Sequence, residues 1–239
     1  MRKGPLKIAL LGYGAMGQLI ADRARAAGHT VGLTVTSSHR PADATLVQQL
    51  ALADVAIDFS SAGAVLANVT ACAAAGRPIV VGTTGWAADF DQSKLIIDRA
   101  GGAMVFGANF SVGVNVFYRV AEVASRMFAA VEGYEPLIEE QHHSRKKDAP
   151  SGTAVKLKHI VERAVKRRID VASTRAGHIP GTHRVGFDSR VDQVLLTHTA
   201  RNREGFADGA VLAAGWIVGK TGVFEFDHIM DDILPKEVS

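Results

Sequence analysis

The sequence predicts an α/β fold in which a doubly wound parallel sheet is joined to a second, α+β domain. Two observations support this prediction. In the first half of the chain, short β-branched apolar runs alternate with longer helical patterns, which is typical of βαβ units. In the second half, a long helical pattern is followed by several strand-like runs, which favours a separate α+β domain.

In the first half, several apolar runs have the length and composition of buried parallel strands. They are Lys7–Leu11, Thr30–Thr36, Val55–Phe59, Pro78–Val81 and Ala103–Phe106. The helical patterns between them are Ala15–Ala27, Thr45–Leu52, Ala62–Ala75 and Asp89–Arg99. Gly28 and Gly76 follow two of these helices at the position where left-handed backbone is needed. Because crossovers between parallel strands are right-handed, we expect helices on both faces of the sheet.

The second half begins with a long predicted helix and continues with strands and one more helix. The helices are Val112–Phe128 and Thr153–Arg168, and the strand-like runs are Glu135–Gln141, Val171–Ala176, His183–Phe187 and Gln193–Thr199. A polar loop separates the first of these strands from the second helix. The tail is again a helix, Gly205–Gly219, then a strand, Val223–Phe226, which we expect to fold back onto the first domain.

The composition excludes several classes of protein. With 239 residues, 47% of them hydrophobic and 21% charged, the chain can bury a core, and disorder is not expected. The formal charge of +3 is spread along the chain, which suits binding of small anions better than binding of nucleic acid. Cys72 is the only cysteine, no cleavable signal is recognised, and no apolar run approaches the roughly 20 residues of a membrane span. We expect a cytoplasmic protein without a membrane partner.

A glycine-rich turn follows the first predicted strand. Its sequence is Gly12-Tyr13-Gly14-Ala15-Met16-Gly17, a G-x-G-x-x-G that opens an amphipathic helix. This context is the one that a Rossmann-type dinucleotide site requires, since the diphosphate then meets free N–H groups and the positive end of the helix dipole. A merely flexible turn is the alternative. We interpret these six residues as cofactor-binding.

The residues after the second predicted strand bear on the choice of cofactor. An NAD site carries Asp or Glu there, to hold the ribose 2′-hydroxyl. This chain has Ser37-Ser38-His39-Arg40 instead, and Arg40 can pair with a 2′-phosphate. We therefore predict that NADPH is preferred and that NADH use remains possible; the alternative is that Arg40 is a solvated surface residue.

Two further turns fall at the carboxyl ends of predicted strands, where open α/β sheets bind ligands. They are Gly82-Thr83-Thr84-Gly85 and Ala108-Asn109-Phe110-Ser111. Their hydroxyl and backbone groups are suited to positioning a nicotinamide. Either turn is equally compatible with an ordinary βα loop.

A basic segment precedes the helix of the second domain. Between positions 142 and 147, five of six side chains are potentially cationic: His142, His143, Arg145, Lys146 and Lys147. Ser151 is a natural N-cap, so the N–H groups of Gly152 and Thr153 in the first helical turn can hold a carboxylate. Together these features suit a small substrate with two carboxylates.

The same segment has a candidate for proton transfer, because histidine titrates near neutral pH. A solvated basic loop or a chance group of metal ligands is the alternative. We predict no metal site, since no cysteine lies near and no third ligand occurs at metal-site spacing in the sequence.

The run from His142 to Thr153 closely resembles the H-H-x-x-K-x-D-x-P-S-G-T signature of the 4-hydroxy-tetrahydrodipicolinate reductase family. The resemblance extends over nearly the whole chain, including Gly82–Gly85, Asn109–Asn115 and Arg175–His183, although the glycine turn is one residue shorter than usual. It implies that His142 donates or accepts a proton and that Lys146 donates one. It further implies that His143 contacts the substrate and that Gly152 and Thr153 hold a substrate carboxylate.

The resemblance also implies a reaction, a domain division and an assembly. Hydride would pass from NAD(P)H to a cyclic unsaturated imine dicarboxylate, giving tetrahydrodipicolinate in lysine and diaminopimelate biosynthesis. Gly82, Thr83 and Thr84 would contact the cofactor, together with Gly107, Ala108, Asn109 and Phe110. Residues 1–110 and 204–239 would form the dinucleotide-binding domain, and residues 111–203 the substrate-binding and oligomerisation domain of a homotetramer.

Two other functions remain as alternatives. Another amino-acid dehydrogenase would share the glycine turn but has no need of the His142–Lys146 cluster. A non-catalytic, dinucleotide-sensing relative would be expected to lack one of those two residues.

Overall fold

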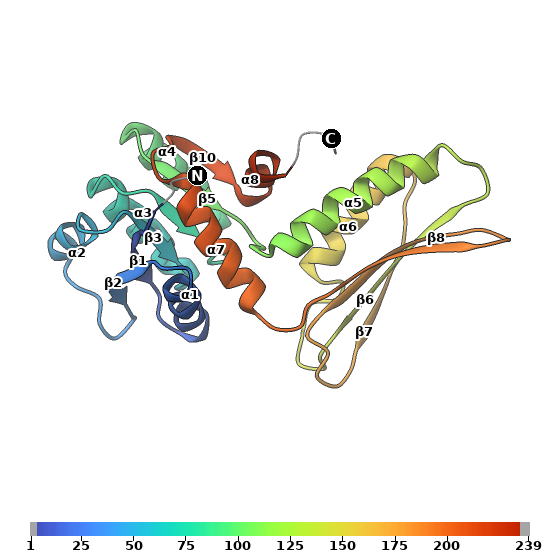
Figure 1. Cartoon of the computed structure of the whole chain (residues 1–239), viewed down its shortest axis with the longest axis horizontal. Helices are drawn as coiled ribbons and strands as arrows, with labels where there is room; N and C mark the ends of the chain where they lie inside the picture. The colour runs from blue at the N-terminus through green and yellow to red at the C-terminus, as the bar shows by residue number, and fades with distance from the viewer. Residues whose placement is uncertain (1–3, 235–239) are drawn as a thin grey trace. The chain divides into compact units, whose positions relative to one another are not determined.

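The computed structural model of the protein describes residues 4–234 (Figure 1). It divides into two units: residues 4–112 with 204–234, and residues 113–203. In the described part of the chain, no helix is long and apolar enough to cross a membrane.

The first unit is built on a six-stranded, all-parallel sheet. Its strands are β1 (Lys7–Leu11), β2 (Thr30–Val35), β3 (Val55–Asp58), β4 (Ile79–Val81), β5 (Ala103–Phe106) and β10 (Gly222–Glu225). They lie in the order β10-β5-β4-β3-β1-β2, so the strand order reverses between β1 and β3. The doubly wound parallel sheet predicted from the sequence is confirmed.

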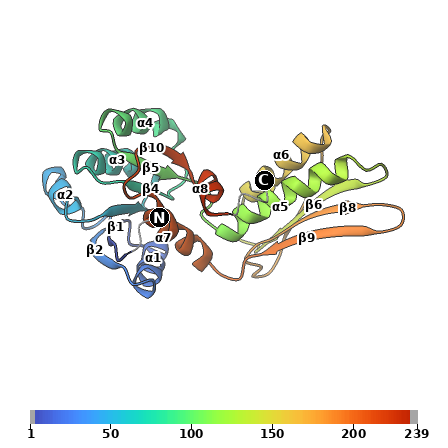
Figure 2. The ribbon, with the colours of Figure 1, turned by 45° about the horizontal axis from the view of Figure 1, so that its top comes forward.

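Helices cover both faces of this sheet (Figure 2). One face carries α1 (Ala15–Ala26) and α7 (Glu204–Ile217); the other carries α2 (Asp43–Leu50), α3 (Val65–Ala74) and α4 (Phe90–Arg99). Two short 3-10 helices, η1 (Ala62–Ala64) and η2 (Ala87–Asp89), precede α3 and α4, and α8 (Phe226–Ile233) follows β10. Gly28 and Gly76 have φ angles of 81° and 65°, as predicted for helix ends.

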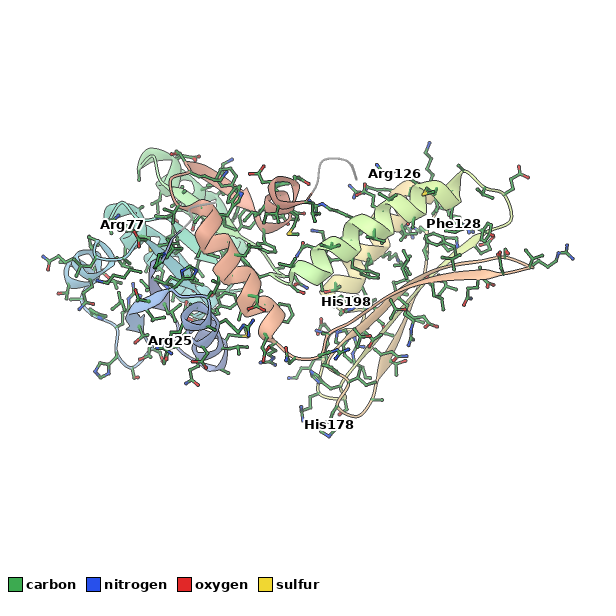
Figure 3. All side chains as sticks on the ribbon, in the orientation of Figure 1. Arg25, Arg77, Arg126, Phe128, His178 and His198 are labelled. Carbon is green, nitrogen blue, oxygen red and sulfur yellow. The ribbon has the colours of Figure 1, made fainter. Side chains whose placement is uncertain are left out.

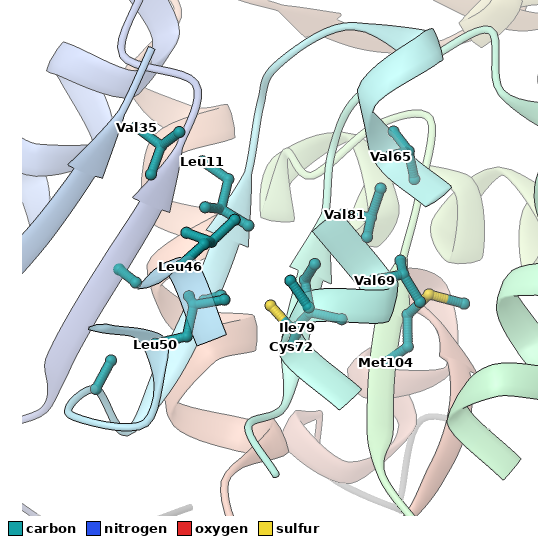
Figure 4. Packing of buried hydrophobic residues seen from close by; sticks show 14 of the residues in the cluster. Leu11, Val35, Leu46, Leu50, Val65, Val69, Cys72, Ile79, Val81 and Met104 are labelled. Atoms are coloured by element: carbon teal, nitrogen blue, oxygen red, sulfur yellow. The ribbon is translucent and has the colours of Figure 1, made fainter. Parts of the chain in front are cut away.

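A hydrophobic core lies between the sheet and the helices α2, α3 and α4 (Figure 4). Leu46 and Leu50 of α2 and Cys72 of α3 are completely buried there, against sheet residues such as Ile79 and Val81. Because both faces of the sheet are covered, its strands are continuous apolar runs rather than alternating ones. This rigid layer fixes the turns at the carboxyl ends of the strands.

The second unit is a four-stranded mixed sheet with α5 and α6 on one face (Figure 1). Its elements are α5 (Val112–Ala129), β6 (Glu135–His142), α6 (Gly152–Val165), β7 (Val171–Arg175), β8 (Thr182–Asp188) and β9 (Gln193–Thr199). The order is β7-β6-β8-β9, with β6 parallel to β7 and antiparallel to β8. The α+β character predicted for this half is confirmed.

The alternation of side chains along β6 separates two surfaces. Ile138, Glu140 and His142 are buried on the face covered by the helices. Leu137 and Glu139 lie on the other face, which no described helix covers. The covered face is therefore where a buried polar site can form.

Candidate active site

The glycine turn links β1 to α1 in the first unit. Gly12 has a φ of 97°, and a Cβ atom there would lie 2.3 Å from the carbonyl oxygen of Phe59. At Gly17, a Cβ atom would lie 2.1 Å from the carbonyl oxygen of Gly12. These two glycines are required by the fold of the turn itself.

Gly14 is different, because an added Cβ atom would meet nothing within 4 Å. It is the N-cap of α1, no side chain caps the helix, and the first turn contains no acidic residue. The uncapped N–H groups and the open space above them fit the diphosphate of a dinucleotide. Tyr13, Ala15 and Met16 are all at least partly exposed beside this space.

A buried carboxylate ties together the loops around this turn. Asp58, at the end of β3, is fully buried, and its Oδ1 accepts hydrogen bonds from the hydroxyl groups of Ser60 and Thr83 at 2.7 Å. Its Oδ2 accepts a hydrogen bond from the Asn68 amide at 2.7 Å. Asn68 in turn accepts a hydrogen bond from Arg40. The Arg40 side chain is thus anchored from the core, and its Nη2 also lies 3.8 Å from Asp43.

The other two predicted cofactor loops contain both buried and exposed residues. Thr83 is buried with its hydroxyl directed at Asp58, Gly82 packs against the Phe59 ring, and Thr84 is exposed.

In the second of these loops, the Phe110 ring is 2% exposed and packs on the ring of Phe226, with 4.6 Å between centroids. Gly107 and Asn109 are partly exposed, and Ala108 is exposed. In these loops, only backbone groups and the exposed residues are available to a ligand.

In the second unit, His142 ends β6 and is 8% exposed. Its ring lies edge-on to that of His183 on β8, with 5.1 Å between centroids. Burial lowers the pKa of His142, and the charges of Lys146 and Arg175 lower it further, whereas Glu140 raises it. His142 is therefore a buried proton-transfer candidate whose charge depends on its neighbours.

Glu140 and Arg175 form an ion pair next to His142. Arg175 Nη2 donates to Glu140 Oε1 at 2.6 Å, and Glu140 Oε2 is hydrogen-bonded to His142 Nδ1. Burial pushes the pKa of Glu140 upward, but hydrogen bonds from Arg175, Ser173 and His142 outweigh it, so the pKa is lowered overall. The carboxylate is charged at neutral pH.

His183 connects the sheet to the start of α6. Its Nε2 lies 3.1 Å from the hydroxyl of Ser151, which is the N-cap of α6 and accepts a hydrogen bond from the Ala154 N–H. Burial lowers the pKa of His183 to about 4, so the ring is neutral at pH 7. Gly152 and Thr153 lie in the first turn of the helix, beside this histidine pair.

Lys146 lies in the loop after β6 and is partly buried. Its Nζ is 2.8 Å from Asp148 Oδ1, and its N–H donates to the carbonyl oxygen of His143 at 3.1 Å. The hydrogen bond from Lys146 lowers the pKa of Asp148. The Nδ1 atom of His143 is buried without a hydrogen-bond partner in the described part of the chain. The loop thus contains a partly buried cation, Lys146, and a buried histidine nitrogen without a described partner.

Glu140, His142 and His183 offer donor atoms within 4.8 Å of one another, a set that resembles a metal site. However, the carboxylate of Glu140 already bonds Arg175 and His142. A guanidinium on the same carboxylate opposes a divalent cation electrostatically. We therefore interpret the group as a hydrogen-bond network and keep the prediction that no metal is required.

Sequence reasoning did not place Glu140, Arg175 and His183 in this site. They come together through strand register: Arg175 is opposite His142 in the parallel pair, and His183 is opposite Glu140 in the antiparallel pair. One signal was present in the sequence, since Glu140 and His142 are two residues apart and share a face of β6.

A doubly wound sheet with an uncapped glycine turn, joined to an α+β unit that carries a buried histidine and a partly buried lysine, is the architecture of a two-domain NAD(P)H-dependent oxidoreductase. Two family models match the chain: "Dihydrodipicolinate reductase, N-terminus" over residues 6–110 and "Dihydrodipicolinate reductase, C-terminus" over residues 113–230. The chain belongs to the dihydrodipicolinate reductase family.

Individual relatives agree with this assignment. A 4-hydroxy-tetrahydrodipicolinate reductase of Christiangramia forsetii is 37% identical over 95% of this chain and 99% of its own length. One from Ralstonia nicotianae is 34% identical over 94% of this chain and 99% of its own. Among solved structures, a dipicolinate-bound dihydrodipicolinate reductase from Paenisporosarcina sp. TG-14 has a TM-score of 0.80. It is 19% identical, covers 95% of this chain and 100% of its own, and supports the fold alone.

Proposed function

We propose that this protein is a 4-hydroxy-tetrahydrodipicolinate reductase, which reduces a cyclic unsaturated imine dicarboxylate to tetrahydrodipicolinate. The observation that carries the proposal is the cluster of His142, Lys146 and the α6 N-terminus. When bound, the reduced nicotinamide supplies the hydride. The protein residues bind the dianion and supply the proton that the reduced product needs.

The substrate is held by its two negative charges. Gly152 and Thr153, in the first turn of α6, bind one carboxylate through the positive end of the helix dipole. His143 is partly exposed and contacts the substrate with the accessible part of its ring, since its Nδ1 atom is buried. The cations Lys146 and Arg175 make the surroundings favourable for a dianion.

Two side chains take part in the proton transfer. His142 donates or accepts a proton on its Nε2 atom, and Lys146 acts as a donor from the adjacent loop. Partial burial of both groups strengthens their electrostatic effect on a bound anion, because little water screens them. A positioned acid of this kind contributes about 10²–10⁴-fold to the rate.

We propose that the dinucleotide lies along Gly12–Gly17 and the exposed parts of the loops at Gly82–Thr84 and Gly107–Phe110. NADPH is the preferred form, because Arg40, in the loop after β2, is anchored through Asn68 and can pair with a 2′-phosphate, and residues 36–40 contain no acidic side chain that would oppose it. NADH is accepted with lower affinity.

We also propose a homotetramer assembled through the open face of the second sheet. Leu137 and Leu195 meet over Gly186 on that face, where a Cβ atom at Gly186 would lie 2.7 Å from Leu195. Leu195 is 49% exposed, although it lies inside a seven-residue strand, as its third residue. A second copy of the sheet would cover these leucines.

The proposed reaction is tested by following NADPH oxidation with substrate generated in situ by the preceding synthase. Lys146→Ala is expected to lower kcat by about 10²-fold or more, because the proton donor is lost, while the dissociation constant for NADPH stays within about twofold. Lys158→Ala removes a lysine that pairs with Glu162 on α6 and serves as the matched control.

Two outcomes would count against this assignment. Unchanged turnover in Lys146→Ala excludes the role of Lys146. Tight binding of NADPH by the wild-type protein without any turnover would indicate a non-catalytic, dinucleotide-sensing relative instead.

A further inference from the structure

Glu140 is a buried carboxylate whose two oxygens have different partners. The residue is 1% exposed, on the helix-covered face of β6. Oε1 accepts a hydrogen bond from Arg175 Nη2 at 2.6 Å, and Oε2 is hydrogen-bonded to His142 Nδ1. Burying a carboxylate costs free energy unless the charge is paired. A buried carboxylate beside a proton-transfer histidine therefore suggests a functional role.

We propose that Glu140 is a positioning residue, which keeps the proton of the His142 ring on Nδ1 and leaves Nε2 as the atom that exchanges a proton with the substrate. A charged carboxylate only accepts hydrogen bonds, so the nitrogen that faces it must carry hydrogen. The ring is thereby fixed both in tautomer and in orientation. This inference rests on the proposed role of His142.

Arg175 connects the Glu140–His142 pair to the loop that carries Lys146. The Nη2 atom that pairs with Glu140 also donates to the backbone carbonyl oxygen of Asp148, at 2.5 Å. Asp148 in turn binds Lys146 Nζ through its carboxylate, at 2.8 Å. One ion pair therefore links the strand that carries His142 to the loop that carries Lys146, and holds both proposed proton donors in place.

Charged groups from β6, β7 and the loop after β6 act on the His142 ring. Glu140 on its own strand is negative, while Arg175 on β7 and Lys146 in the following loop are positive. His183 on β8 is neutral, and His198 on β9 lies behind it with its own pKa lowered by burial. Among the groups in residues 4–234 that act on the ring, Glu140 favours its protonated form, whereas Lys146 and Arg175 oppose it.

Removing the charge of Glu140 should therefore alter the chemistry and not only the stability. Without it, His142 faces cations alone, and its pKa falls further below the ordinary value. If protonated His142 is the acid, the fall of kcat/KM with rising pH then begins at lower pH. A purely structural role would lower activity equally at every pH.

The experiment compares Glu140→Gln with Glu135→Gln, which removes a carboxylate from the exposed start of the same strand, where Glu135 pairs with Arg167. At pH 7, Glu140→Gln is expected to lose about 10–10²-fold in kcat/KM, with the alkaline limb of the profile displaced to lower pH. Binding of NADPH should be unchanged within about twofold. Glu140→Asp, which keeps the charge, should recover part of the loss, and Glu135→Gln should match the wild type.

A second measurement does not depend on activity or on a variant that folds. The ¹⁵N chemical shifts of the His142 ring in the wild-type protein are expected to show a neutral ring protonated on Nδ1. Protonation on Nε2 would overturn the proposal, as would a Glu140→Gln profile superimposable on the wild type. Failure of the proposed reaction would appear separately, as wild-type protein that oxidises no NADPH with the proposed substrate, whereas full turnover in His142→Ala would show that His142 takes no part in the reaction.

Discussion

Arg40 is the single residue on which the proposed cofactor preference depends. It pairs with Asn68, which is held by the buried Asp58, so the guanidinium is fixed before any ligand arrives. A guanidinium has five N–H donors; Nη1 bonds Asn68 and Nη2 lies 3.8 Å from the exposed Asp43 carboxylate, which leaves other N–H groups for a phosphate. A pre-positioned arginine loses little side-chain freedom when it binds.

Arg40→Ala is expected to reduce kcat/KM with NADPH by about 10–10²-fold, because charge-assisted hydrogen bonds contribute about 1.5–3 kcal/mol. Turnover with NADH should change by less than about twofold. Calorimetric binding of 2′,5′-ADP and of 5′-AMP separates affinity from turnover, and Arg25→Ala, on the exposed side of α1, is the matched control. Equal weakening of both nucleotides would contradict the assignment to the 2′-phosphate.

Residues within one short motif could be predicted from the sequence, whereas partners from distant segments could not. The spacing of Gly12 and Gly17 predicts a tight turn, and the close contacts of both positions explain the glycines. Arg175 is 35 residues from Glu140, and their pairing follows from the register of β6 and β7. No local pattern encodes that register, since it is set by packing of the whole sheet.

At the scale of elements, the open face of the second sheet is the surface on which the proposed assembly depends. Leu195 lies on the edge strand β9, and edge strands with exposed apolar residues favour association with another chain. Leu195→Glu is expected to shift the protein from four chains to one or two, because a charge cannot be buried unpaired. Analytical ultracentrifugation measures this change.

Leu52→Glu provides the control, since Leu52 is 67% exposed in the first unit and far from β9 in the sequence. It should leave the sedimentation coefficient unchanged. A wild-type protein that sediments as a single chain at micromolar concentration would refute the tetramer directly.

The elements themselves were largely predictable, and, apart from the missed helix α8, the errors concern their ends. Helix α6 ends at Val165, three residues before the predicted end, because Lys166 adopts left-handed backbone with a φ of 56°. The predicted helix at Ala62–Ala75 begins with a 3-10 turn, η1. The strand predicted at Val223–Phe226 is β10, but Phe226 already starts α8, which was not predicted. Hydrophobic periodicity and residue propensity predict that a helix or strand exists better than they predict the residues at which it begins and ends.

At the scale of the whole molecule, each unit has its own core. The first contains the cluster around Leu46, Val69 and Ile79. In the second, α5 and α6 pack on the sheet, and Phe128, labelled in Figure 3, has its ring stacked on that of Phe187. The chain leaves the first unit before α5 and returns at α7, and β10 then pairs with β5. The alternation of strand and helix patterns in the sequence predicted the parallel sheet. The order of its strands, however, depends on segments that are distant in sequence, such as β10 pairing with β5.

The separate cores allow the acid sensitivity of each unit to be measured separately. Burial lowers the pKa of His183 to about 4, and also lowers the pKa values of His142 and His198, all in the second unit. In the unfolded chain these histidines titrate near about 6.5. The unfolded state therefore binds more protons between about pH 6.5 and 4, so stability is full above that range and is lost as pH falls through it.

For His183 alone, lowering the pH from 7 to 5 should cost the second unit about 2 kcal/mol. Amide hydrogen exchange in β6 and β8 reports opening of that unit, whereas both tryptophans, Trp86 and Trp216, report the first unit. His183→Gln should flatten the pH dependence of exchange in β8, since a neutral amide cannot take up the proton. His178→Gln, in an exposed loop, should preserve it (Figure 3). An equal pH dependence in all three proteins would show that burial of His183 does not destabilise its charged form.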